Sequence, residues 1–74
     1  MTNVKSVLEN EGLTVKQKGH VYIVKDMIGN EIKLISENEK IKVIDRNYDY
    51  EYCNLNETKQ IVYSVFSALE SENN

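Results

Sequence analysis

Four short β-rich segments follow one another along this chain with only a few residues between them. The first, LTVKQK at 13–18, alternates apolar with polar side chains, which is the period of a strand with one dry face. The other three are HVYIVK (20–25), EIKLIS (31–36) and KIKVID (40–45). Gly19 and the MIGN stretch at 27–30 supply residues that tolerate the positive φ of tight turns. Connections this short predict a four-stranded antiparallel meander.

An amphipathic helix is predicted at each end of the meander. NVKSVLENEG begins at a capping Thr2 or Asn3 and ends at Gly12, which can adopt positive φ. NLNETKQIVYSVFSALESENN begins at a capping Asn54 or Asn56. This second helix carries a continuous apolar stripe of Ile61, Val62, Val65, Phe66 and Leu69. Both helices therefore need an apolar surface to lie on.

One face of the sheet must be covered, and the two helices are suited to cover it. We expect the covered face to consist of Leu13, Val15, Val21, Ile23, Ile32, Leu34, Ile41 and Val43. The chain has 74 residues, of which 41% are hydrophobic, and this number of hydrophobic residues is sufficient for one small core. The sequence thus predicts a single α+β domain over residues 1–74. It has a short N-terminal helix, the antiparallel meander, room for a short fifth strand, and a C-terminal amphipathic helix packed on one sheet face.

The sequence also narrows the compartment and the cofactor chemistry. MTNVKSVLEN has no apolar run typical of a signal peptide, and no stretch approaches the roughly 18 apolar residues of a membrane span. We therefore expect a cytoplasmic protein with no membrane contact. A single cysteine, Cys53, and a single histidine, His20, cannot form a disulfide or a closed zinc site. Because nucleotide-binding and metalloprotease motifs are also absent from the sequence, we expect no cofactor and no metal site.

His20 and Cys53 are the only nucleophilic pair that the composition permits. They are far apart in the sequence, and no third residue that would orient them is evident. The simpler interpretation places His20 at the start of a strand and makes Cys53 a small apolar filler. We expect no catalytic residues and no enzyme activity.

The segment RNYDYEYCN, at 46–54, alternates tyrosine with acid. If it is extended, the tyrosines share one face and the acids share the other. An edge strand with tyrosines packed on a helix and acids in water would show this pattern. The alternative is an exposed segment whose acids, about 6.7 Å apart, mimic a nucleic-acid backbone for a basic groove. Its partner-binding residues would be Asp45, Tyr48, Asp49, Tyr50, Glu51 and Tyr52.

The sheet face away from the helices is a second candidate interface. Its predicted members are Tyr22, Val24, Ile35 and Ile44, among Lys16, Lys18, Lys33 and Lys42. It is either a solvated surface, whose lysine stems cover the isoleucines, or an interface with a partner or a second copy. Single-stranded nucleic acid that stacks on Tyr22 is a third alternative for this face. It ranks behind the other two, and direct contact with nucleic acid is not expected, because the net charge is −3 and this predicted face has one aromatic residue.

A hairpin of the sequence resembles a known family. EGLTVKQKG followed by YIVKDMIGNEIKLISENE, with GNE, IS and ENE in the hairpin, resembles small acidic anti-CRISPR inhibitors from phage, over about half of the chain. The resemblance implies a phage or mobile-element inhibitor that presents acids to the DNA-binding surface of the CRISPR nuclease, but it transfers no functional residue. The leading hypothesis is a small acidic protein-binding module that occupies a basic, nucleic-acid-binding site of a larger protein. The alternative is a homo-oligomeric or assembly subunit that uses the outer sheet face.

Overall fold

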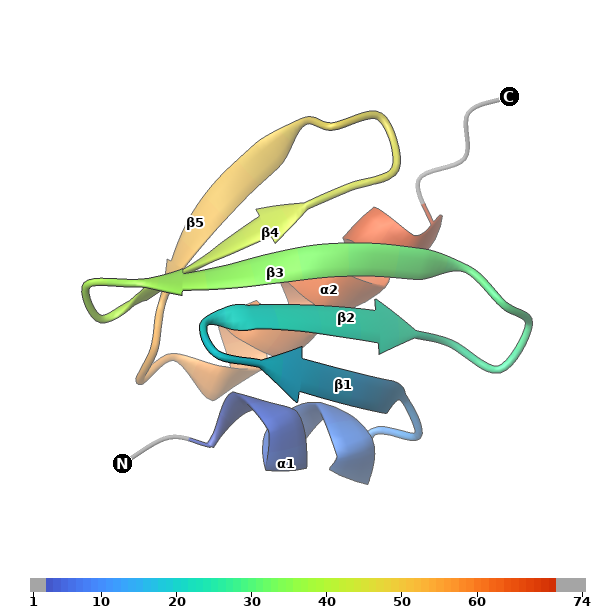
Figure 1. Ribbon diagram of the computed structural model, residues 1–74, viewed down its shortest axis with the longest axis horizontal. Coiled ribbons are helices and arrows are strands. Elements are labelled where there is room, and N and C mark those ends of the chain that lie inside the picture. Colours follow the sequence, from blue (N-terminus) through green and yellow to red (C-terminus); the bar gives the residue numbers. More distant parts are fainter. Residues whose placement is uncertain (1–2, 71–74) are drawn as a thin grey trace.

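The protein is represented by a computed structural model, which describes residues 3–70. The elements are α1 (Val4–Asn10), β1 (Thr14–Lys18), β2 (Val21–Lys25), β3 (Glu31–Glu37), β4 (Lys40–Ile44), β5 (Tyr50–Asn54) and α2 (Thr58–Glu70). The five strands form one antiparallel sheet in the order β1-β2-β3-β4-β5 (Figure 1). The predicted α+β meander is therefore confirmed, and the tyrosine-rich segment supplies its fifth strand.

One face of the sheet is covered by the helices. Helix α2 lies across this face and contacts β3, β4 and β5, while α1 lies beside β1 and also contacts α2 (Figure 1). The covered face and the two helices enclose a single core. Its members are Val4, Leu8, Leu13, Val15, Tyr22, Val24, Ile32, Leu34, Ile41, Val43, Cys53, Ile61, Val65, Ala68 and Leu69.

The predicted orientation of β2 is wrong. We expected Val21 and Ile23 to point inward, but Tyr22 and Val24 do, with 9% and 0% of their surfaces exposed. The cause is the turn between β1 and β2, which pairs Lys18 with Val21 and so puts Val21 on the lysine side of the sheet. In antiparallel strands directly paired residues share a face, so a tight turn decides which face every later residue occupies.

The β2–β3 and β4–β5 loops have the same architecture, although their sequences are DMIGN and DRNYD. In the first, Asp26 Oδ1 accepts hydrogen bonds from the backbone N–H groups of Ile28 (3.1 Å) and Asn30 (2.8 Å). In the second, Asp45 Oδ1 accepts from those of Asn47 (2.8 Å) and Asp49 (3.0 Å). Such a leading aspartate organises a loop by taking the place of backbone acceptors.

The fourth residue of each of these loops has left-handed backbone geometry. It is glycine in one loop, with φ of 94° at Gly29, and tyrosine in the other, with φ of 68° at Tyr48. Glycine adopts this geometry without strain, whereas a residue with a Cβ does not. Tyr48 is therefore held in a strained conformation that its equivalent, Gly29, avoids.

The helix starts were predicted with mixed success. The Asn3 side chain accepts from Ser6 N at 3.0 Å and so caps α1, while Thr2 lies outside the described residues. The predicted caps Asn54 and Asn56 are wrong for α2. That helix begins at Thr58, and the Glu57 carbonyl accepts from Ile61 N at 3.1 Å. Asn54 is instead the last residue of β5, where it pairs with Lys40.

Candidate binding surface on the open face of the sheet

The sheet face opposite the helices is uncovered, and its side chains form two rows that cross all five strands. The strand registers define one row as Lys16, Ile23, Lys33, Ile44 and Tyr50, and the other as Lys18, Val21, Ile35, Lys42 and Tyr52. Each row contains two lysines and two aliphatic residues, and it ends on a tyrosine of β5. We call these ten residues the open face.

The positive charge of the protein is concentrated around this surface. All six lysines of the five strands, but only two of the three acidic residues of these strands, point to this side of the sheet. Besides the lysines of the rows, they are Lys25, Lys40, Glu31 and Glu37. The Lys25 ammonium lies 3.8 Å from the Glu31 carboxylate. The net charge of −3 therefore conceals a basic sheet face on an otherwise acidic molecule.

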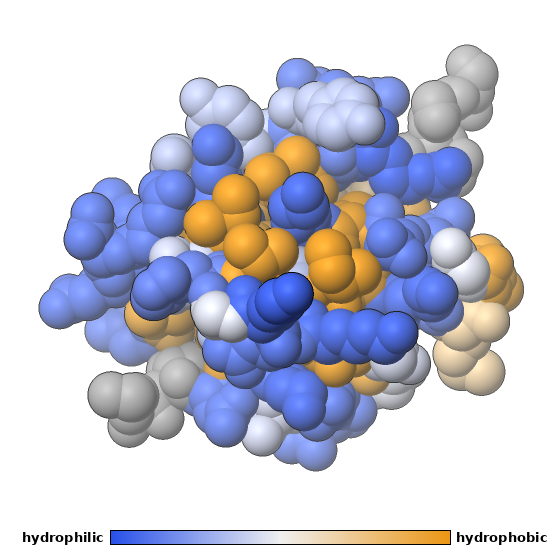
Figure 2. Space-filling view, viewed as in Figure 1, coloured by the Kyte–Doolittle hydropathy of each residue, from blue (hydrophilic) through white to orange (hydrophobic). Residues whose placement is uncertain are grey.

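The centre of the open face is apolar. Its four aliphatic side chains, Val21, Ile23, Ile35 and Ile44, are half-buried rather than buried. Figure 2 shows a hydrophobic patch in the middle of this side of the molecule, with hydrophilic side chains around and across it. Lysine stems can shield such a patch while their ammonium groups stay in water. The open face thus combines apolar contact area with mobile positive charge.

Two exposed tyrosines occupy the β5 end of the rows. Tyr50 is 59% exposed and Tyr52 is 48% exposed. Their ring centroids are 5.8 Å apart, with an angle of 77° between the rings. The Lys42 ammonium lies 4.3 Å from the centroid of Tyr50 and 6.0 Å from that of Tyr52. A cation over an aromatic ring is attracted by the negative face of the ring, so Lys42 and Tyr50 form a cation–π contact on the open face.

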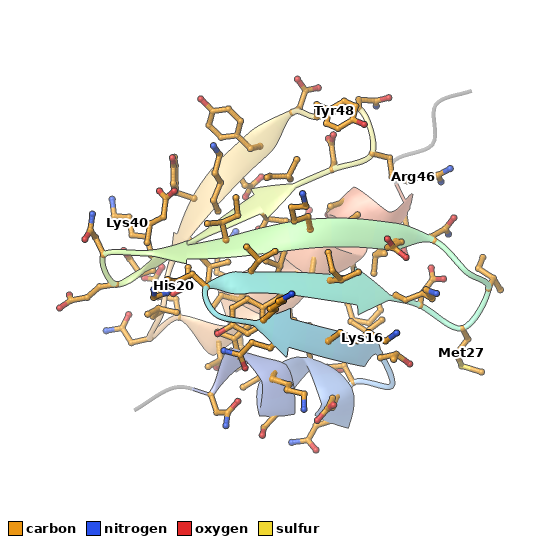
Figure 3. All side chains as sticks on the ribbon, viewed as in Figure 1. Lys16, His20, Met27, Lys40, Arg46 and Tyr48 are labelled. Carbon is orange, nitrogen blue, oxygen red and sulfur yellow. The ribbon has the colours of Figure 1, made fainter. Side chains whose placement is uncertain are left out.

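A shallow groove of about 370 Å³ lies where the open face meets the β4–β5 loop. Ile23, Lys33 and Ile44 of the open face line it, together with Arg46 and Tyr48 of the loop. The carboxylates of Glu31 and Asp45 also belong to its lining. Figure 3 shows Arg46 and Tyr48 on this loop. Tyr48 is 84% exposed and brings a third accessible aromatic ring to the same region.

The β2–β3 loop lies next to the β4–β5 loop. Arg46 Nη1 donates a hydrogen bond to Asn30 Oδ1 at 3.1 Å, which links the two loops. The β2–β3 loop carries the two most exposed large apolar residues of the described chain, Met27 at 91% and Ile28 at 84%. Exposed apolar and aromatic side chains are therefore concentrated at this end of the sheet as well as on its open face.

The residues of the predicted acidic tyrosine segment lie on both sides of β5. Its tyrosines are exposed, as the binding hypothesis requires, and Asp45 lines the groove together with Tyr48. Glu51 points to the helix side, where its Oε2 accepts from Ser64 Oγ at 2.8 Å. Four of the six predicted partner-binding residues, Asp45, Asp49, Tyr50 and Glu51, nevertheless line one hollow of about 150 Å³ beside α2. Tyr50 and Tyr52 thus lie on the open face and Glu51 on the helix side, which is the division that the alternation predicts for an extended strand.

The alternative interface of Tyr22, Val24, Ile35 and Ile44 is wrong in half of its members. Ile35 and Ile44 belong to the open face, but Tyr22 and Val24 are buried under the helices. The residues in their place are Val21 and Ile23. The signal that could have found them is the spacing of Lys18 and Val21 around Gly19, which is typical of a two-residue hairpin turn.

The two residues of the only nucleophilic pair occupy different environments. His20 is exposed in the turn between β1 and β2, whereas Cys53 is 3% exposed beneath α2. The Cys53 thiol donates to Ser64 Oγ at 3.3 Å. The described residues, 3–70, contain no cluster of three or more histidine, cysteine or acidic side chains that could hold a metal ion. Within the same range, neither helix is long and apolar enough to cross a membrane.

Comparisons of this chain with protein-family models, with curated proteins and with solved structures find no match. The resemblance to anti-CRISPR inhibitors therefore rests on the quoted hairpin residues alone.

Proposed function

We propose that this protein is a small binding module that holds an anionic macromolecule against the open face of its sheet. The observation that carries the proposal is the pair of rows in which lysines, aliphatic residues and exposed tyrosines cross all five strands. The lysines supply attraction over a distance, and the apolar and aromatic side chains supply contact area. The predicted binding module is thus retained, but its binding surface is the open face and the charge expected of its partner is negative.

The distribution of charge also bears on self-association. If two copies met by their open faces, each would place its lysines against the lysines of the other, and such like-charge contacts cost several kcal/mol. A second copy is therefore a poor occupant for this face. The predicted homo-oligomer remains testable by light scattering, where a monomer at high protein concentration contradicts it.

Retention on immobilised heparin tests the proposal, because heparin is a polyanion without bases or peptide groups. We expect the protein to be retained at low salt and pH 7.5 despite its net charge of −3. Lys33→Glu, in the centre of the open face, is expected to elute much earlier. Lys59→Glu on α2 changes the net charge equally and is expected to elute close to the wild type. Equal shifts for the two variants would contradict the proposal.

A second candidate function keeps the acidic segment as the contact. The hollow in which Asp45, Asp49 and Glu51 come together favours this function. The protein would then inhibit a larger protein by occupying the basic site of that protein. Binding of a lysine-rich polypeptide across a salt series tests this function, with the double variant Asp49→Lys/Glu51→Lys compared with Glu9→Lys/Glu11→Lys. If the two double variants weaken binding equally, the hollow has no special role.

A further inference from the structure

We infer that the anionic ligand of the open face is single-stranded nucleic acid, with its phosphates over the lysines and its bases on the tyrosines. This inference rests on the proposed function and specifies the class of ligand. The expectation against nucleic acid depended on the net charge of −3 and on a face with one aromatic residue, Tyr22. The structure places Tyr22 in the core and puts Tyr50 and Tyr52 on the open face instead.

The positions of the lysines suit a flexible phosphate chain. Lys16 and Lys18 are alternate residues of β1, so their side chains leave the sheet about 7 Å apart. Lys33 is two strands away from Lys16 in the same row, which corresponds to about 10 Å. These separations are on the scale of successive phosphates. A backbone that crosses the strands can therefore meet two lysines in each row, with aliphatic residues between them.

The tyrosines distinguish nucleic acid from an acidic polypeptide. A chain of carboxylates would be attracted by the lysines but would gain little from flat, exposed rings. Every nucleobase, by contrast, has a π-face that stacks on an aromatic side chain, whatever the base sequence. The Lys42 ammonium, 4.3 Å from the Tyr50 centroid, occupies the face on which a base would stack. A base that displaces it leaves the ammonium beside the adjoining phosphate.

The groove at the edge of the open face provides a further base position. Its lining includes aliphatic Ile23 and Ile44 and aromatic Tyr48. The cations Lys33 and Arg46 balance the charge of the two carboxylates that also line it, Glu31 and Asp45. A volume of about 370 Å³ admits a base that has left its stack. Bases in a duplex are paired and stacked, so their faces cannot reach these positions without disruption of the helix. The surface therefore favours single strands, and five strands at about 4.8 Å spacing offer room for roughly three or four nucleotides.

Fluorescence anisotropy with a labelled twelve-nucleotide oligothymidine tests the inference. We expect the single strand to bind more tightly than a duplex of the same length. Tyr50→Ala should weaken binding roughly tenfold, since one base–aromatic stack contributes that much. Tyr63→Ala, which removes a 69% exposed tyrosine from α2, is the matched control and should have no effect. Lys33→Gln should lower the slope of log affinity against log salt by about 0.7, the value for one lost phosphate contact.

A conservative variant separates stacking from folding. Tyr50→Phe keeps the ring and is expected to bind like the wild type, so weak binding by Tyr50→Ala together with normal binding by Tyr50→Phe identifies the ring as the contact. Equal loss for Tyr50→Ala and Tyr63→Ala, or tighter binding of the duplex, overturns the inference.

Two further probes distinguish failure of this inference from failure of the proposed function. If the oligonucleotide does not bind at 50 mM salt but heparin or labelled polyglutamate binds in a manner that requires Lys33, the ligand is not nucleic acid and the proposed function stands. If none of the three probes binds through the open face, the inference and the proposed function are both wrong.

Discussion

Tyr48 combines a strained backbone with an exposed aromatic side chain. Its backbone is left-handed, with φ of 68°, and its side chain is 84% exposed. Left-handed geometry costs a residue with a Cβ about 1–2 kcal/mol, and an exposed ring makes few contacts that would offset this. Strain of this kind is often retained where a side chain has a binding role. The position of Tyr48 at the groove is consistent with such a role.

Replacement of Tyr48 separates stability from binding. Tyr48→Gly is expected to raise the free energy of unfolding by about 1 kcal/mol, because glycine adopts the left-handed geometry freely. The same variant should bind oligothymidine more weakly. Glu39→Gly is the control, since Glu39 also has positive φ, 68°, in the β3–β4 turn but lies outside the groove. Glu39→Gly should raise the free energy of unfolding by a similar amount and leave the affinity for oligothymidine unchanged. Urea denaturation and anisotropy measure the two effects, and a destabilised Tyr48→Gly would contradict the prediction.

Asp26 makes the stability of the β2–β3 loop depend on pH. Burial raises the pKa of this carboxyl group, but hydrogen bonds from the backbone and side chain of Asn30 and from the backbone of Ile28 and Gly29 together lower it. A lowered pKa means that the folded state favours the carboxylate. The stabilisation of the folded state by the Asp26 carboxylate is therefore complete above the unfolded-state pKa of aspartate, about 3.9. It is lost as the pH falls through the lower folded-state pKa.

The pH dependence can be isolated with Asp26→Asn, which removes the titrating group but keeps a side-chain oxygen acceptor. We expect the wild type to have the higher urea midpoint at pH 7, with the difference between the two proteins shrinking as the pH falls below about 4. Urea denaturation at pH 7, 5, 4, 3 and 2 measures this. A difference that stays constant down to pH 2 would show that Asp26 acts independently of its charge.

At the scale of the elements, the sequence identifies the strands well and their faces less well. Strands β1, β3 and β4 alternate apolar with charged residues, so the sequence predicts both their existence and their orientation. Strand β2 has four consecutive apolar residues, VYIV, and such a run contains no period from which a face could be chosen. Only the turn around Gly19 determines the register there. Without the register that this turn sets, the residues of the open face cannot be identified correctly from the sequence.

Two valines of β2 test the corrected orientation. Val24 is fully buried and Val21 is half-buried on the open face. Val24→Ala should lower the free energy of unfolding by about 2 kcal/mol, from lost transfer free energy and the cavity left behind. Val21→Ala, the same chemical change on the same strand, should lower it by less than about 1 kcal/mol. Urea denaturation ranks the two variants, and the opposite order would restore the orientation first predicted from the sequence.

At the scale of the whole molecule, composition and fold give different electrostatic descriptions. The composition describes an acidic protein with a charge of −3, and this supported the expectation of a basic partner. Alternation along the strands nevertheless sends six lysines to one side of the sheet, while most acids lie in turns, in the helices or beside α2. The number of charged residues in a stretch of sequence does not reveal this separation, because neighbouring residues of a strand point to opposite faces.

Charge separation of this kind predicts how the protein interacts with itself. The basic face of one copy attracts the acidic side of another at low salt, when screening is weak. We therefore expect the second virial coefficient, measured by static light scattering, to be negative at 10 mM salt and to rise at 300 mM. Lys33→Glu should make the low-salt value less negative, whereas Lys59→Glu, with the same change in net charge, should have little effect.

A uniformly acidic molecule behaves in the opposite way, since its copies repel at low salt and salt reduces that repulsion. A coefficient that falls as salt rises would therefore contradict the charge separation on which the open-face proposal depends.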